Sequence, residues 1–209
     1  MDYEIFDAEM PIPACFCAIH SAEDAVAAFI SSAKEYGYDD ARMTKIKDHV
    51  AKATVSLLAQ KISGILRIGR YQVAVALNPK TQALAARYIA DGQTHCNEAL
   101  TKLPHFHDEQ EKILPDFYDE LANMFGDVTE LKTAVRIGQE ARATVFYASR
   151  TGYPTGLDEP NEPLARECHL TLGLIWAAID TKQNGAEKIP LIELALQTAN
   201  IVIAELKRR

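Results

Sequence analysis

Apolar residues recur at steps of three and four along most of the 209-residue chain, the pattern of helices that bury one face. The longest run covers residues 40–69, with a stripe that begins at Met43. Asn78 followed by Pro79 is typical of an N-cap and a first-turn proline, and predicts a helix that ends near residue 102. We expect a bundle of about six to eight helices, the others over residues 22–36, 108–125, 128–149, 164–183 and 189–207.

One short segment departs from the helical pattern. Residues 71–77 alternate in the way that a half-buried strand does. No second alternating segment offers them a partner, so we interpret them as helix or connector. The sequence therefore predicts an all-α class, with at least half of the residues helical and no sheet of three or more strands.

Two further stretches lack the three-and-four spacing. Residues 1–20 contain Pro11 and Pro13 and are expected to form an extended N-terminal lead-in that packs on the bundle. Residues 151–163 hold three prolines and two glycines, which predicts a long loop at one end of the bundle. With these two stretches included, residues 1–209 are predicted to be a single helical domain.

Charge is distributed in blocks. Residues 1–40 carry nine acidic residues and one lysine, and residues 41–90 carry nine lysines or arginines and one aspartate. Residues 91–130 carry ten acidic residues and two lysines. Opposite blocks in one chain either pair within the fold or form surfaces for a partner. We expect pairing mainly within the protein, and keep the partner surface as the alternative.

Cysteine usage and hydropathy bear on the cellular compartment. Cys15, Cys17, Cys96 and Cys168 are expected to be free thiols, because no secretion signal accompanies them and the domain is large enough to bury a core. The first residues are acidic, and the apolar stretch 170–179 is about half as long as a membrane-spanning helix. We therefore expect a cytoplasmic protein with no membrane segment.

A group of imidazoles and carboxylates is the strongest candidate for a metal site. His105, His107 and Glu109 lie close together in the sequence, with His95 upstream. Such side chains suit a divalent transition metal. The paired Glu-x-x-His motifs of di-iron bundles are missing, however, as is His-Glu-x-x-His. We therefore predict no bound metal or other cofactor, and keep a metal-binding enzyme that uses these residues as the alternative.

A basic stripe in the 40–69 helix is the candidate partner-binding site. Arg42, Lys45, His49 and Lys52 recur at three- and four-residue steps. We do not expect nucleic acid as the ligand, because the flanking acidic blocks would repel phosphate and no aromatic stacking pattern accompanies the stripe. The stripe is expected to pair within the protein, and the alternative is that it binds a protein partner.

A second group of side chains suggests a small anion. Arg142 and Arg150 precede the long loop, and Tyr153 lies within it. Guanidinium and phenol groups at the end of a bundle could hold a small anionic ligand. These three residues are the candidate ligand-binding site, and an enzyme that uses the loop after Arg150 belongs to the same alternative.

The last predicted helix is apolar on nearly all sides, which indicates that other helices cover it on nearly all sides. We expect a homodimer through residues 189–206, because a two-fold interface is the commonest way to hide such a surface. The alternative is a central helix that its own chain covers. The function that the sequence favours is a non-catalytic regulatory or protein-interaction protein that acts through charge-segregated surfaces.

Overall fold

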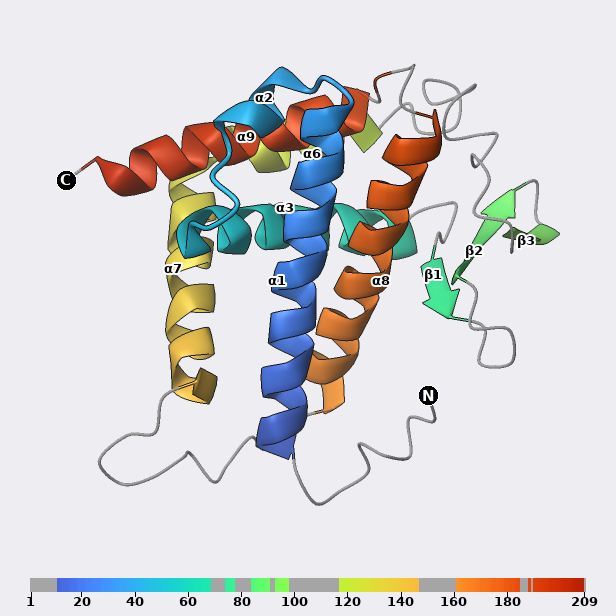
Figure 1. Ribbon diagram of the computed structural model, residues 1–209, viewed down its shortest axis with the longest axis horizontal. Coiled ribbons are helices and arrows are strands. Elements are labelled where there is room, and N and C mark those ends of the chain that lie inside the picture. The colour runs from blue at the N-terminus through green and yellow to red at the C-terminus, as the bar shows by residue number, and fades with distance from the viewer. Residues whose placement is uncertain are drawn as a thin grey trace.

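A computed structural model describes residues 11–68, 74–77, 84–90, 93–97, 117–146, 161–184, 188 and 190–208 (Figure 1). These ranges contain α1 (Pro11–Glu35), α2 (Asp39–Met43), α3 (His49–Ile68), β1 (Ala74–Leu77), β2 (Leu84–Ala90), β3 (Gln93–Asn97), α6 (Phe117–Gly126), α7 (Val128–Phe146), α8 (Asn161–Asn184) and α9 (Pro190–Lys207). The multi-helix bundle predicted from the sequence is confirmed, with seven helices in the described part of the chain.

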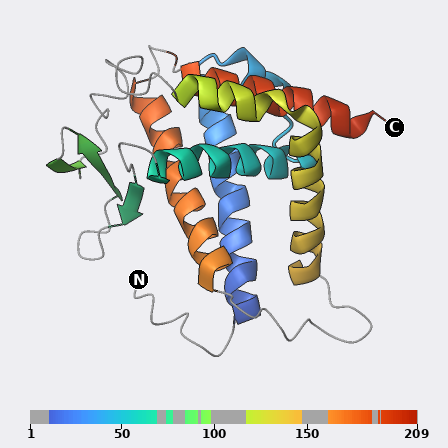
Figure 2. The same ribbon diagram turned by 180° about the vertical axis from the view of Figure 1, so that it is seen from behind.

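The helices are arranged in two directions. α1, α7 and α8 run alongside one another, and α3 and α9 cross them (Figures 1 and 2). α1 packs most extensively on α8, and α3 contacts α1, α7, α8 and α9. α9 also contacts α2 and α7, so it is covered by three elements of its own chain.

The core is formed where these crossing helices meet. Apolar side chains from α1, α3, α6, α7, α8 and α9 form one buried cluster. Its largest fully buried members include Val26, Ile30, Leu58, Leu121, Leu131, Val135, Leu196 and Val202. Burial of a side chain of this size contributes about 1.5–3 kcal/mol, so the crossing point holds the bundle together.

The first helix begins earlier than the sequence analysis predicted. α1 starts at Pro11, so the prediction of an extended lead-in over residues 1–20 is wrong for residues 11–20, and residues 1–10 lie outside the described part. Pro11 and Pro13 fall in the first turn, where a helix has no intrahelical partner for its N–H groups. These prolines are therefore compatible with a helix start.

The end of α1 follows the expected chemistry. Gly37 has a φ of 85°, a conformation that glycine adopts without steric cost. Its N–H donates to the carbonyl of Lys34 at 3.3 Å, and the N–H of Tyr38 donates to the carbonyl of Ala33 at 3.0 Å. This pair of bonds is a Schellman motif, and the buried Tyr38 and Ala33 supply its apolar contact. Gly37 is therefore the glycine C-cap that ends α1.

The long helix predicted over residues 40–69 is in fact two helices. α2 ends at Met43, and Thr44 has an extended conformation with φ −79° and ψ 119°. α3 begins at His49. The side chain of the preceding residue, Asp48, accepts a hydrogen bond from the Val50 N–H at 2.9 Å. Asp48 is thus the N-cap of α3, and this local bond competes with a continuous helix.

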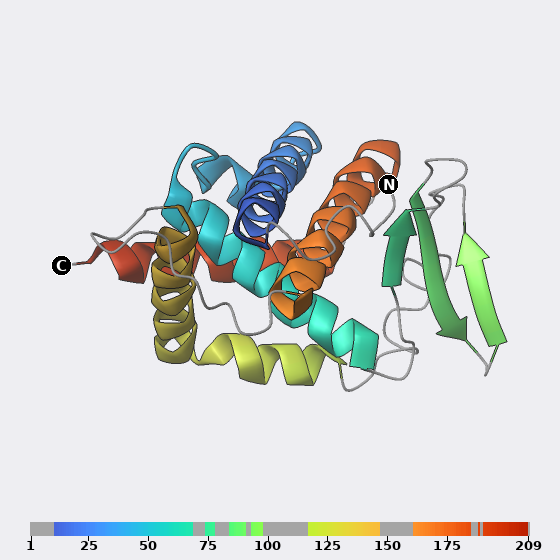
Figure 3. The ribbon, with the colours of Figure 1, turned by 90° about the horizontal axis from the view of Figure 1, so that it is seen from below.

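The region between α3 and α6 contains a small sheet that the sequence analysis missed. β1, β2 and β3 form an antiparallel sheet in that order, and β1 contacts α8 and α3 at the side of the bundle (Figure 3). The predictions of helix or connector over residues 71–77 and of a helix over 79–102 are therefore wrong where strands are described. The expectation that no three-stranded sheet forms is wrong for the same reason.

The remaining helices lie close to their predicted positions. α7 and α9 agree with the helices predicted over residues 128–149 and 189–207, within a few residues at each end. α6, over residues 117–126, agrees with the second part of the helix predicted over 108–125, whose first part lies outside the described residues. α8 begins at Asn161, so residues 161–163 of the predicted long loop are helical, and residues 151–160 are outside the described part.

α1 is also long and apolar enough to span a membrane. Ala14–Glu35 meets that criterion by length and composition, and half of the qualifying segment is buried inside the bundle. The apolar stretch considered from the sequence, 170–179, is shorter, and this longer one was overlooked. A central helix of a helical bundle has the same composition, and the extensive packing of α1 on α8 accounts for it here.

Candidate functional site

The α2–α3 connection and its flanking turns present a row of positive side chains. We call Arg42, Met43, Lys45, Lys47, His49 and Lys52 the basic surface; all are exposed except Lys52, which is half-buried. The basic stripe predicted from the sequence lies within it. Because α2 and α3 are separate helices, the stripe follows a bent connection and does not lie on one helical face.

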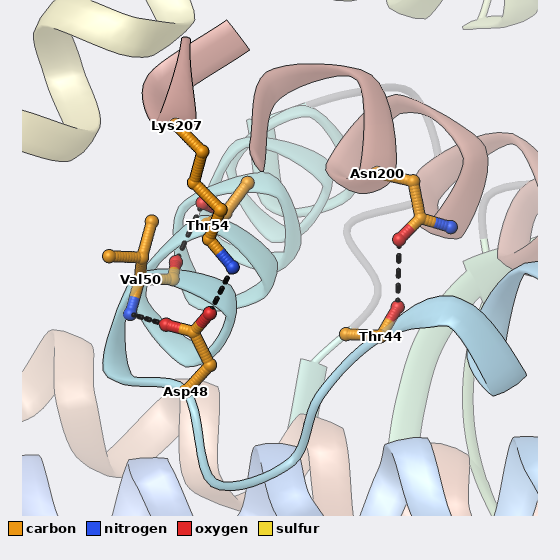
Figure 4. A network of polar contacts seen from close by, with 6 residues as sticks. All are labelled: Thr44, Asp48, Val50, Thr54, Asn200 and Lys207. Atoms are coloured by element: carbon orange, nitrogen blue, oxygen red, sulfur yellow. Dashed lines mark hydrogen bonds and ion pairs between the residues drawn. The ribbon is translucent and has the colours of Figure 1, made fainter. Parts of the chain in front are cut away.

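Thr44 fixes the first half of this connection. Its side chain is buried, and its hydroxyl lies 3.1 Å from both the carbonyl of Asp40 and Oδ1 of Asn200 on α9 (Figure 4). Asn200 Nδ2 in turn donates to the carbonyl and to Oδ1 of Asp40, at 2.9 and 3.1 Å. The carbonyl of Thr44 accepts a hydrogen bond from Lys34 at 2.9 Å. The end of α2 is therefore tied to both α1 and α9.

Asp48 fixes the second half. Oδ1 caps α3 through the Val50 N–H, and Oδ2 forms an ion pair with Lys207 at the end of α9 (Figure 4). Burial of the carboxyl would raise its pKa, but the hydrogen bonds from Lys207 and Val50 and the charge of Lys207 outweigh it, so the pKa is lowered. The single acidic side chain between Arg42 and Lys52 is thus engaged inside the protein.

The charges of the basic surface are largely uncompensated. Arg42 pairs with Asp39 at 3.6 Å, but both side chains are highly exposed, and such pairs contribute little, about 0–1 kcal/mol. Among the described residues, Lys45, Lys47 and Lys52 have no ion-pair partner. The expected internal pairing of the basic stripe is therefore found in the described part only for Arg42 and His49.

His49 connects the basic surface to a buried carboxylate. Its Nδ1 lies 3.7 Å from Oε2 of Glu23 on α1, and the Glu23 side chain is only 11% exposed. Arg142 on α7 contacts the same carboxylate at 2.7 Å, between Nη2 and Oε1, and lies 3.3 Å from His49 Nδ1. This Glu23 junction joins α1, α3 and α7, and it supports the start of α3 from the inner side.

The structure describes one of the three residues of the predicted anion site. Arg142 lies on α7, where its guanidinium neutralises Glu23. Arg150 and Tyr153 lie outside the described residues. Anion binding by these three residues stays a prediction, and the contact to Glu23 gives Arg142 a structural role in addition.

The predicted metal ligands are placed only in part. His95 belongs to β3, while His105, His107 and Glu109 lie outside the described residues. Within the described ranges, no three His, Cys, Asp or Glu side chains gather in an arrangement that could hold a metal ion. The metal-binding alternative therefore stays a prediction.

Three described cysteines are free thiols with different environments. Cys17 is exposed, Cys15 is buried and Cys168 is half-buried. Burial raises the pKa of Cys15, and the charge of Glu167 raises it further. Burial likewise raises the pKa of Cys168, with smaller contributions from Glu167 and Cys15. The two thiols thus share one environment between α1 and α8, and it disfavours the thiolate.

Several important residues of this region were not identified from the sequence. Met43 was assigned to a buried stripe, yet it is 73% exposed. Asn200 was counted within an apolar helix, and the sequence alone does not distinguish it from Gln197, the other amide in the middle of that run. The structure leaves Gln197 exposed and partly buries Asn200, whose amide therefore needs a polar partner. Asp48 is the one acidic residue among nine basic residues in the 41–90 block. An aspartate directly before an apolar periodic run is a sequence signal for a helix N-cap, and this signal was not used.

Comparison with protein-family models, with curated proteins and with solved structures finds no match to this chain. The geometry of the basic surface is therefore the observation that bears on function.

Proposed function

We propose that the protein is a non-catalytic regulatory or interaction protein, and that it binds a protein partner through the basic surface. One observation carries this proposal. The connection that bears Arg42, Lys45 and Lys47 is fixed by hydrogen bonds to α1 and α9, while these side chains remain exposed. A connection of this kind presents charge in a fixed arrangement.

Two physical effects support binding at such a surface. A backbone that is already fixed loses little conformational entropy when a partner binds, so more of the contact energy contributes to affinity. Several like charges on one surface also attract an oppositely charged partner before contact, which raises the association rate at low ionic strength. Both effects favour recognition by surface complementarity.

A charge-reversal variant tests this proposal. We expect Arg42→Glu with Lys45→Glu to lose a partner that the unaltered protein retains from cell extract, and to bind that partner, once purified, more than about tenfold more weakly. The matched control is Arg136→Glu with Lys182→Glu, which makes the same charge change at exposed positions on α7 and α8.

Thermal unfolding by circular dichroism shows whether both variants remain folded. If every retained protein binds the two variants and the unaltered chain equally well, the basic surface is not the binding site and the proposal is wrong.

A further inference from the structure

Met43 is the most exposed large apolar side chain in the described part of the chain. It ends α2 between Arg42 and Thr44, and Thr44 is buried and bonded to Asn200. The backbone on both sides of Met43 is therefore held, and the side chain cannot turn into the core. A thioether adapts its shape readily to an apolar neighbour, which suits it to a binding surface.

Met43 belongs to an alternating pattern. Positions 43, 45 and 47 are exposed, while Thr44 is buried and Ile46 packs partly against the core. An apolar group and two ammonium groups are thus presented together from one short connection. The surface offers positive charge on both sides of a single apolar contact point, because Arg42 precedes Met43 in the chain.

We propose that the partner is an acidic protein segment that places an apolar side chain against Met43 while its carboxylates contact Arg42, Lys45 and Lys47. This inference rests on the proposed function and specifies the partner's chemistry. Carboxylates complement the ammonium and guanidinium groups, and an apolar side chain removes the exposed thioether from water.

The same surface fits nucleic acid and lipid less well. Residues 42–52 contain no Phe, Tyr or Trp on which a base could stack. A membrane surface would require an apolar face, and Met43 is the only large apolar side chain that is exposed in this segment, all of which the structure describes. An acidic segment with one apolar side chain complements both the positive charges of this surface and the exposed thioether of Met43.

The test uses two fluorescein-labelled peptides and fluorescence anisotropy at low ionic strength. One peptide consists of glutamate and aspartate with a central leucine, and the other has serine in place of that leucine. We expect the leucine peptide to bind about fivefold more tightly, since one apolar contact is worth about 1 kcal/mol. Met43→Ser should remove this fivefold advantage and leave the affinity for the serine peptide unchanged.

Matched variants separate the two proposals. Ile137→Ser, at an exposed apolar position on α7, should leave both affinities unchanged. Lys45→Glu should lower the affinity for both peptides. Met43→Ser could bind the leucine peptide with the affinity of the unaltered chain, while Lys45→Glu still lowers the affinity for both peptides. This result would show that the inference about Met43 is wrong and would leave the proposed function in place.

Two other outcomes would also overturn the inference. If Lys45→Glu changes neither affinity, the basic surface binds no acidic segment and the proposed function fails as well. If a uridine oligonucleotide or phosphatidylserine vesicles bind more tightly than the leucine peptide and lose affinity in Lys45→Glu, the surface recognises phosphate groups.

Discussion

At the scale of single residues, Asp48 has two roles that substitution can separate. Asp48→Ala removes both the N-cap of α3 and the ion pair with Lys207, and should lower the free energy of unfolding by about 1–2 kcal/mol. Asp48→Asn keeps an oxygen acceptor for the Val50 N–H, so it should cost less, about 0.5 kcal/mol. Urea unfolding measures both. Equal losses in the two variants would show that the cap contributes nothing.

The charge of Asp48 also makes stability depend on pH. Its pKa is lowered in the folded protein, so the folded state favours the ionised carboxyl. This stabilisation is complete above the ordinary pKa of 3.8 and is lost as the pH falls through the lower folded value. We expect the difference in unfolding free energy between the unaltered chain and Asp48→Asn to shrink over that range. A difference that grows on acidification would contradict the assignment.

Thiol chemistry gives a second prediction at this scale. Iodoacetamide reacts with thiolates, and the pKa values of Cys15 and Cys168 are raised, chiefly by burial. In the native protein at pH 8, Cys17 should be alkylated well before either of them, because it is exposed. Peptide mass spectrometry over time measures the order. Alkylation of Cys15 as fast as Cys17 would show that α1 opens around it.

At the scale of elements, two glycines should respond to alanine in opposite ways. Gly37→Ala forces a side chain into a positive φ and should destabilise the protein by about 1 kcal/mol, through the Schellman motif that ends α1. Gly138→Ala lies within α7, where an added Cβ meets nothing within 4 Å, and should stabilise by about 0.5–1 kcal/mol. Thermal unfolding of both variants checks the signs.

The elements also show how far sequence periodicity can lead. Helices α7 and α9 were predictable because long runs repeat one spacing. The strands were missed because their partners were sought as alternating apolar runs, and residues 84–97 do not alternate clearly. The turn signal was present, since Asp91 and Gly92 separate β2 from β3, and this dipeptide is typical of a two-residue hairpin.

The positive charge of the candidate site could be predicted from the sequence, but the conformation of the α2–α3 connection could not be predicted in full. Arg42, Lys45, His49 and Lys52 were identified from their spacing, which assumes one continuous helix. Asp48 gave a local signal for the start of α3, but the conformation at Thr44 also depends on Asn200, which lies 156 positions later in the chain. A local pattern carries no information about the contact to Asn200, so the exposure of Met43 could not be derived.

At the scale of the whole molecule, the exposed residues of α9 indicate which side chains the predicted homodimer would bury. α9 is covered by α2, α3 and α7, and its exposed positions include Gln197, Ile201 and Ala204. We predict a dimer through residues 189–206 that uses this line. Light scattering should give a two-chain mass for the unaltered protein and a one-chain mass for Ile201→Asp. Ile137→Asp, at an exposed position on α7, is the matched control. A one-chain mass for the unaltered protein at all concentrations would end this prediction.

The tie between the α2–α3 connection and α9 has a consequence for biosynthesis. Asp40, Thr44 and Asp48 leave the ribosome long before Asn200 and Lys207 are made, and their bonds to α9 cannot form until then. α1 can close its Schellman motif at once, because all of its partners are local. The basic surface therefore takes its final shape only after α9 has been synthesised. A nascent chain arrested before residue 200 should carry the same positive charges without the ability to bind an acidic segment in register.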